Sequence, residues 1–194
     1  MIEERNKRSL EKILVVDLEA TCWQGKKPED QESEIIEIGI CELDLKTLER
    51  SNKSGLIIKP ENSAVSEFCT ELTSLTQNDV DKGIKLEEAC DIIRNDYHSQ
   101  SYIWSSYGEY DHQMLRKECH LKKAKYHFSN KHIDLKVLFA VLQGLPKPVG
   151  MKKALNICKT ELEGTHHRGV DDAWNIAGIL AHMLKSYRLG LSID

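Results

Sequence analysis

A run of four apolar residues, Ile13 to Val16, leads directly into Asp17, Leu18 and Glu19. Unbroken runs of β-branched and leucine residues are typical of strands buried on both faces, which lie in the middle of a sheet. Side chains alternate along a strand, so Asp17 and Glu19 share one face. Two carboxylates so close repel each other unless one is protonated or a cation lies between them. The alternative is a strand that runs into a polar loop, and a D-x-E pair alone favours it.

The rest of the chain predicts an α/β order. We expect strands at 35–43, 48–59 and 102–104, helices at 85–97, 108–119, 133–142, 150–158 and 170–187, a polar loop at 24–33 and short helical turns within 61–83. Three strands, a helix, a further strand and then helices indicate an α/β domain with a mixed sheet and helices on its faces.

Size and charge narrow the class of protein. A chain of 194 residues, of which 40% are hydrophobic, fits one domain with a substantial core. The net charge of −4 argues against tight non-specific binding to long duplex nucleic acid, which selects basic surfaces. Metal bound to an acidic site would offset part of that charge.

The cysteines and the N-terminus predict a cytoplasmic protein. The six cysteines, at 22, 41, 69, 90, 119 and 158, show no zinc-binding spacing and no C-x-x-C pair. Reduced cysteines in an intracellular protein are therefore expected. The first ten residues contain no apolar signal segment, and no run approaches the about 20 residues of a membrane span, so no membrane partner is expected.

A second acidic cluster lies at 108–115, with the sequence G-E-Y-D-H-Q-M-L. On a helix that begins near Gly108, Asp111 aligns with Met114 and Leu115, so it points inward. Glu109 aligns with polar residues and faces water. An inward aspartate needs a partner or a metal. The alternative, equally supported by this cluster alone, is that Asp111 caps a helix that begins one turn later.

The third cluster, at 165–173, has the sequence T-H-H-R-G-V-D-D-A. Helical periodicity aligns Asp172 with apolar residues and Asp171 with polar ones, so Asp172 is the inward acid. His167 lies five residues earlier, in a loop flanked by glycines 164 and 169 that suit a tight backbone. The alternative is that the acids complement the dipole of a helix N-terminus while both histidines, His166 included, are exposed.

These clusters together offer carboxylates and an imidazole without cysteine. Such donors suit hard divalent cations, Mg²⁺ or Mn²⁺, which in pairs drive the hydrolysis of phosphodiesters. The candidate residues are Asp17, Glu19, Asp111, His167 and Asp172.

In this order and spacing, the clusters resemble the DEDDh 3′–5′ exonucleases. The shared pattern is D-x-E, a mid-chain Asp, and a histidine followed five positions later by Asp; histidine in place of tyrosine indicates the DEDDh subclass. The segments D-L-E-A-T-C-W, E-I-I-E-I-G, F-C-T-E-L-T and H-R-G-V-D-D-A are most similar to the histone-mRNA and small-RNA trimming exonucleases and their KapD-like bacterial relatives. The resemblance covers about residues 12–185. One departure is Ser74, where the family often has glycine.

The resemblance implies an RNase H-like fold with a mixed five-stranded sheet flanked by helices. The exonuclease domain would span 12–187, with an N-terminal extension at 1–11 and a C-terminal tail at 188–194. The resemblance further implies two Mg²⁺ or Mn²⁺ ions bound by the four acids. Asp17 would bridge the ions, Glu19 and Asp172 would complete the first site, and Asp111 would hold the second. His167 would act as general base.

The implied substrate is the single-stranded 3′ end of RNA or DNA, with RNA favoured, and the product is a nucleoside 5′-monophosphate. The segment with Leu18, Ala20 and Thr21 would contact the terminal nucleotide, and Trp23 would stack on a base. Packing of Trp23 on the sheet edge is an equally supported alternative.

Two other functions fit such a chain. One is a non-catalytic RNA-binding or interaction module that kept the fold, although a complete set of site residues argues against it. The other is a metal-dependent endonuclease on a similar scaffold.

Overall fold

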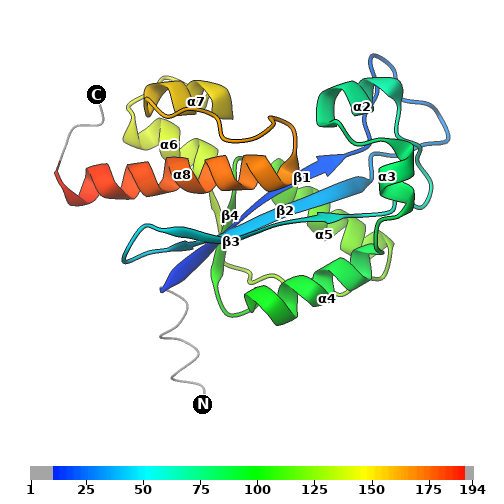
Figure 1. Ribbon diagram of the computed structural model, residues 1–194, viewed down its shortest axis with the longest axis horizontal. Coiled ribbons are helices and arrows are strands. Elements are labelled where there is room, and N and C mark those ends of the chain that lie inside the picture. The colour runs from blue at the N-terminus through cyan, green and yellow to red at the C-terminus, as the bar shows by residue number, and fades with distance from the viewer. Residues whose placement is uncertain (1–10, 191–194) are drawn as a thin grey trace.

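The computed structural model describes residues 11–190, in which one mixed sheet has the strand order β3-β2-β1-β4-β5 (Figure 1). The strands are β1 Lys12–Ala20, β2 Ile35–Asp44, β3 Arg50–Ile57, β4 Ile103–Ser106 and β5 His132–Asp134. Strand β1 pairs antiparallel with β2 and parallel with β4, so the apolar run of the first cluster lies in the central strand. This position is the one predicted from the sequence.

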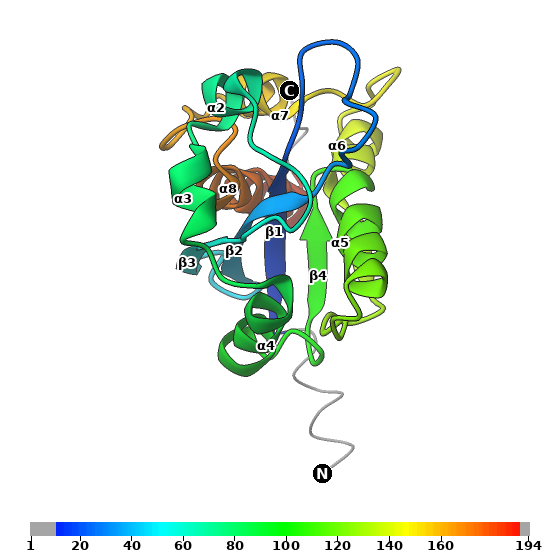
Figure 2. The same ribbon diagram turned by 90° about the vertical axis from the view of Figure 1, so that its right-hand side faces the viewer.

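Seven helices lie within the described range and cover both faces of the sheet. They are α2 Glu67–Thr73, α3 Gln77–Asp81, α4 Leu86–Tyr97, α5 Tyr110–Leu121, α6 Leu135–Leu142, α7 Met151–Ile157 and α8 Gly169–Arg188. Helices α4 and α5 cover one face, and α6, α7 and α8 cover the other (Figures 1 and 2). Helices α2 and α3 pack against the start of β2 at Ile36. The predicted α/β class is therefore correct.

The alternation of side chains along β1 divides the core and aims the first acidic cluster. Leu14 and Val16 pack in the cluster that contains α4 and α5. Ile13 and Val15 pack in the cluster that contains α8. Because Asp17 and Glu19 continue the odd-numbered series, their side chains project from the face that α8 covers.

Two glycines bring the first turn of α8 onto the sheet beside Asp17. Gly39 is the register partner of Asp17 on β2. A Cβ atom built on Gly39 would lie 1.9 Å from the carbonyl carbon of Gly169, and one on Gly169 would lie 3.1 Å from the carbonyl oxygen of Asp17. Only residues without a side chain allow this approach. The acids at the start of α8 are thereby set next to those of β1.

We expect Gly39→Ala to lower the free energy of unfolding by about 1–3 kcal/mol or more, the usual cost of overpacking a core. The added methyl group would meet backbone atoms rather than a flexible side chain. Urea unfolding of the two proteins measures the difference. Gly150→Ala is the matched control, since its Cβ would meet nothing within 4 Å. Equal stability of Gly39→Ala and wild type would contradict the close approach of α8 to β2.

The predicted element boundaries differ from the observed ones by a few residues, most instructively at two places. Residues 133 and 134, expected to begin a helix at 133–142, belong instead to β5, and the helix begins only at Leu135. Asp134 ends the strand and caps α6, because its Oδ1 accepts a hydrogen bond from Val137 N at 3.0 Å. The strand expected at 48–59 covers only Arg50–Ile57, since Leu48 takes a left-handed turn conformation with φ 63°.

The turn after α2 accommodates the departure from the family pattern. Ser74 adopts the left-handed conformation, with φ 64°, and its N–H donates to the carbonyl of Thr70. The turn that glycine usually makes is therefore kept with a serine, at some cost in backbone strain.

The domain limits of 12 and 187 remain predictions. Most of the predicted extension at 1–11 and tail at 188–194 lies outside the described residues. Within the described range, no helix has the length and apolar character needed to cross a membrane.

Candidate active site

Three acids from two distant segments meet on the α8 face of the sheet. One carboxylate oxygen each from Asp17, Glu19 and Asp172 lies within 4.8 Å of the other two. Glu19 and Asp172 are buried, and Asp17 is half-buried. Asp17 and Glu19 reach the site by strand alternation, and Asp172 reaches it from the first turn of α8. The structure thus brings together three of the five predicted residues as one potential ligand set.

Asp111 approaches the same site from α5. Its side chain is buried, and its Oδ1 accepts a hydrogen bond from Leu18 N at 3.0 Å. It lies inside the first turn of α5, where Glu109 occupies the N-cap position, so Asp111 is not the cap of a later helix. Glu109 is exposed, as helical periodicity predicted. The charge of Asp111 reaches Asp17 and helps to raise its pKa.

Burial raises the pKa of all four acids, and neighbouring carboxylates add to the shift. Burial is the largest cause in each case. It raises the pKa of Asp17 well above its usual value, that of Glu19 to about 8, and those of Asp111 and Asp172 to about 6. A site that holds several carboxylates with too little positive charge around them favours either protons or cations. Its all-oxygen donors fit Mg²⁺ or Mn²⁺.

These shifts predict an unusual pH dependence for the metal-free protein. Glu19 loses its proton near its ordinary value of 4.5 when unfolded and near 8 when folded. Between these values the folded state binds more protons, so Glu19 makes stability fall as pH rises. The loss amounts to about 5 kcal/mol at most, since one pKa unit corresponds to about 1.4 kcal/mol.

Urea unfolding at pH 5 and pH 8 in EDTA measures this effect, with Glu19→Gln as the control. We expect wild type to lose more stability than Glu19→Gln between the two values. Added Mg²⁺ should reduce the difference between the proteins at pH 8. If both proteins lost the same stability between pH 5 and pH 8 without metal, the raised pKa of Glu19 would be contradicted.

Both histidines of the third cluster lie against Asp172. The backbone N–H of His167 donates to Asp172 Oδ2 at 2.9 Å, and Nδ1 of His166 lies 3.0 Å from the same oxygen. The two imidazole rings stack with centroids 3.8 Å apart. Burial, and then the neighbouring His166, lowers the pKa of His167, so its ring is neutral at pH 7. The alternative in which both histidines are exposed loop residues does not hold, because both are half-buried.

The loop owes its shape to a strained backbone. Gly164 and His167 both have left-handed backbones, with φ 81° and 63°. Such a conformation is uncommon for a non-glycine residue and is often found at functional sites. Asp171 supports the turn, since its Oδ2 accepts from Thr165 N at 2.8 Å while its Oδ1 pairs with Lys53 at 2.6 Å. The outward acid therefore has a structural partner on each oxygen.

Glu37 and Arg168 form a support that the motif analysis missed. Glu37 is fully buried on β2, in register with Glu19. Its Oε2 accepts from Gly169 N at 2.9 Å and from Arg168 Nε at 3.1 Å, which fixes the start of α8. The available signal was a carboxylate inside an apolar strand, because such a group requires a partner.

The predicted nucleotide-contact segment is only partly accessible. Thr21 is fully buried; its Oγ1 accepts from Glu34 N at 2.9 Å, and its own N–H donates to Glu34 O at 2.8 Å. Thr21 therefore holds the loop before β2, and its side chain is not free for a ligand. Leu18 is also buried, whereas Ala20 and Trp23 are half-buried. Contact with a nucleotide stays a proposal for these residues.

A family model described as exonuclease (RNase T) matches residues 14–180, a span that contains every acid of the site and His167. The chain belongs to the exonuclease family. The predicted resemblance to the DEDDh group is confirmed by the nuclease domain of 3′hExo, a DEDDh family member whose crystal structure contains rAMP. This structure superposes with a TM-score of 0.82 and 29% identity, over 91% of this chain and 93% of that one.

Proteins similar to this exonuclease-family chain include exonucleases from animals. The human 3′-5′ exoribonuclease 1 is 31% identical, over 89% of this chain and 52% of its own length. The 3′-5′ exonuclease Snipper of Drosophila melanogaster is 28% identical, over 89% of this chain and 69% of its own length. The chain thus spans about half of the human protein and somewhat more than two thirds of the fly protein. The RNase H-like fold expected for this exonuclease domain is confirmed.

Proposed function

We propose that this exonuclease-family enzyme removes nucleotides from the 3′ end of single-stranded nucleic acid, RNA in preference to DNA, and releases nucleoside 5′-monophosphates. One observation carries the proposal: Asp17, Glu19 and Asp172 converge within 4.8 Å on a largely buried face, with Asp111 beside them. The expected setting is the cytoplasm. Similar proteins, which include a 3′-exonuclease that recognises a histone mRNA stem-loop and the human 3′-5′ exoribonuclease 1, support RNA as the substrate.

Asp17, Glu19, Asp111 and Asp172 would hold two Mg²⁺ or Mn²⁺ ions. Asp17 suits the bridging position, since Glu19, Asp172 and Asp111 all lie close enough for their charges to raise its pKa. When bound, two such ions neutralise the developing charge on the attacking and leaving oxygens of a phosphodiester. The raised pKa values of these acids support a requirement for positive charge at the site.

His167 would accept the proton of the attacking water. Its backbone N–H is fixed to Asp172, which places the ring beside the acid cluster, and its lowered pKa keeps the ring unprotonated at neutral pH. The half-buried Ala20 and Trp23 would contact the terminal nucleotide at the end of β1, and Trp23 would stack on its base. Leu18 would contribute through its backbone, because the side chain is buried.

Digestion of matched RNA and DNA oligonucleotides tests the proposal. Labelled at the 5′ end, a single-stranded substrate should shorten one nucleotide at a time in Mg²⁺ or Mn²⁺ and remain intact in EDTA. Chromatography should identify nucleoside 5′-monophosphates, and RNA should be degraded faster than DNA. Asp172→Asn is the inactive control for a contaminating nuclease.

A closed circular single strand separates the competing functions. An exonuclease leaves it intact, whereas cleavage of the circle would show an endonuclease. Binding of the linear strand without shortening, at any metal concentration, would instead indicate a nucleic-acid-binding module. Either of these results would overturn the proposed exonuclease activity.

A further inference from the structure

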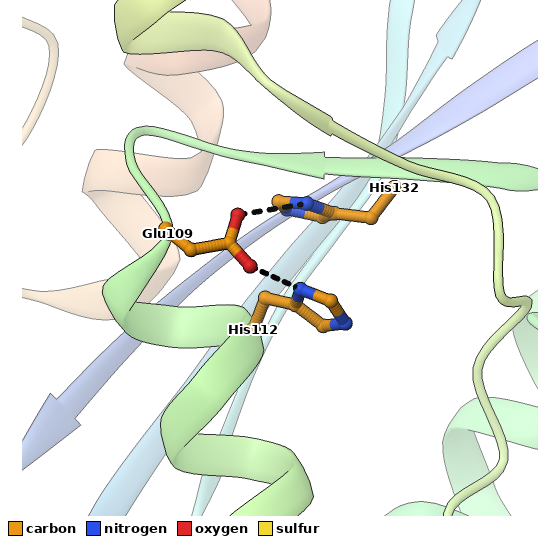
Figure 3. Close-up of side chains that lie close together, drawn as sticks. All are labelled: Glu109, His112 and His132. Atoms are coloured by element: carbon orange, nitrogen blue, oxygen red, sulfur yellow. Dashed lines mark hydrogen bonds and ion pairs between the residues drawn. The ribbon is translucent and has the colours of Figure 1, made fainter.

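A second cluster of metal-ligating side chains lies between the start of α5 and β5. Glu109, His112 and His132 converge so that one donor atom from each lies within 4.8 Å of the other two. Figure 3 shows the Glu109 carboxylate between the two imidazoles. Its Oε1 lies 2.6 Å from His112 Nδ1, and its Oε2 lies 3.6 Å from His132 Nδ1. None of the three belongs to the candidate active site.

The hydrogen bonds around His132 leave a lone pair facing the carboxylate. Ser106 Oγ lies 2.6 Å from the carbonyl oxygen of Gly108 and 2.9 Å from His132 Nε2. A hydroxyl has one proton, and the carbonyl can only accept it, so Ser106 must accept from a protonated Nε2. In the neutral ring, Nδ1 is then an acceptor directed at a carboxylate oxygen. Two facing acceptors are satisfied by a proton or by a metal ion between them.

We propose that Glu109, His112 and His132 bind a divalent transition-metal ion, with Zn²⁺ as the expected occupant, at a site separate from the exonuclease acids. Two imidazoles and one carboxylate are a common ligand set for zinc, with water in the fourth position. The same donors disfavour Mg²⁺, which prefers oxygen ligands throughout. The site therefore differs in its chemistry from the all-acid cluster around Asp17.

The geometry requires little rearrangement to hold such an ion. Ligand bonds of about 2.0–2.2 Å in a tetrahedron place donor atoms roughly 3.3 Å apart. The spacing of 3.6 Å between Glu109 Oε2 and His132 Nδ1 is close to that value. His112 Nδ1 lies 2.6 Å from the other oxygen, Oε1, so the carboxylate would shift outward and either bind through both oxygens or turn to share one. The side chain of Glu109 is 48% exposed, so it can move and leaves a route for the ion.

The histidines are held more rigidly than the carboxylate. Their rings stack with centroids 4.5 Å apart, and His132 packs on the buried Trp104 at 4.4 Å. A metal-binding histidine usually donates its second ring N–H to a fixed acceptor, which here is Ser106 Oγ for His132. Burial also lowers the pKa of His132, which keeps the ring neutral and able to bind metal.

A bound ion would link the first turn of α5 to β5. Asp111 lies in the same turn of α5, but it points inward, where Leu18 N donates to it. Glu109 and His112 instead face His132 on β5. The two sites are therefore neighbours that share a helix and no ligand.

Metal binding to the full-length chain tests the site in an Asp172→Asn background. This substitution removes one ligand from each of the other two candidate clusters in the described residues, Asp17–Glu19–Asp172 and His166–His167–Asp172. The metal-stripped protein is titrated with Zn²⁺ by calorimetry and with Co²⁺ by visible absorption, in excess Mg²⁺. Circular dichroism checks that each variant folds.

We expect about one Zn²⁺ per chain in this background and an absorption band typical of four-coordinate Co²⁺. Added Glu109→Gln or His112→Asn should weaken Zn²⁺ binding by more than about 100-fold. Ser106→Ala, which removes only the outer hydrogen bond of His132, should weaken it by about 10–100-fold. His120→Asn, on the exposed side of α5, is the matched control and should bind as the background does.

The proposal is overturned if the background binds no Zn²⁺, because Glu109 would then be only a hydrogen-bond partner of the histidines. It is equally overturned if Glu109→Gln and His112→Asn leave the affinity unchanged. In an otherwise wild-type chain, Glu109→Gln should keep its Mg²⁺-dependent nuclease activity. Failure of the zinc site is thereby distinguished from failure of the exonuclease function.

Discussion

Asp172→Asn is expected to abolish metal-dependent turnover, whereas Asp171→Asn should leave most of it. The two side chains are adjacent in sequence but face opposite ways from the first turn of α8. Asp172 is buried beside Asp17 and Glu19, while Asp171 pairs outward with Lys53 and Thr165. Asparagine has an amide nitrogen in place of one carboxylate oxygen, so it keeps the shape of Asp172 but lacks the charge that would bind metal. Rates of 3′-end shortening in saturating Mg²⁺ measure the difference.

Stability separates a lost ligand from a damaged fold. Without metal, Asp172→Asn should be as stable as wild type or slightly more stable, because repulsion among the acids is relieved. Asp171→Asn should instead lose some stability, since its paired oxygens organise the turn before α8. Asp17→Ala should follow Asp172→Asn in losing turnover. Equal loss of activity in the 171 and 172 variants would show that the inward acid has been wrongly assigned.

Periodicity allowed the sequence to predict which acids point inward. On β1, a period of two places Asp17 and Glu19 on one face. On α5 and α8, the helical repeat separates Asp111 from Glu109 and Asp172 from Asp171, and burial follows that division. The central position of β1 followed from its unbroken apolar run. Regular elements repeat their geometry, so a few residues determine the direction of the rest.

Features that depend on irregular backbone or on contacts distant in sequence were not predictable in this way. The stacking of His166 on His167 follows from a left-handed residue in a loop, which no periodicity describes. β5 has only three residues, too few to show alternation. The zinc candidate joins Glu109 and His112 to His132 across a sheet edge, and only the fold brings them together.

The role of Glu37 was only partly predictable from the sequence. An acid inside an apolar strand indicates that its carboxylate has a buried partner, but the sequence does not identify that partner. The partner proved to be the start of α8, 131 residues away at Arg168, with Gly169 beside it. Close packing of Gly39 on Gly169 makes the two segments one unit. The site therefore depends on the contact between β2 and α8 as much as on the acids themselves.

His167→Ala is expected to lower the maximal rate by about 10²–10⁴-fold, the usual contribution of general acid–base catalysis. Its lowered pKa means that wild-type activity should rise with pH to a plateau, with the midpoint of the rise below pH 6.5, as the ring loses its proton. The variant should lack this plateau and gain rate as the hydroxide concentration rises. Metal affinity should change little, because the ring is assigned to the proton and not to the ion.

His166→Ala is the matched comparison, since the two rings stack and both lie near Asp172. We expect a smaller loss of maximal rate and a higher metal concentration for half-saturation, because the His166 ring contacts the carboxylate assigned to the metal. Rates over a matrix of pH and Mg²⁺ concentration separate the two roles. If His167→Ala instead loses metal and its residual rate ignores pH, His167 is a ligand. If His166→Ala shows the larger loss of rate together with rescue at high pH, the base is His166, and the left-handed turn at position 167 serves to present it.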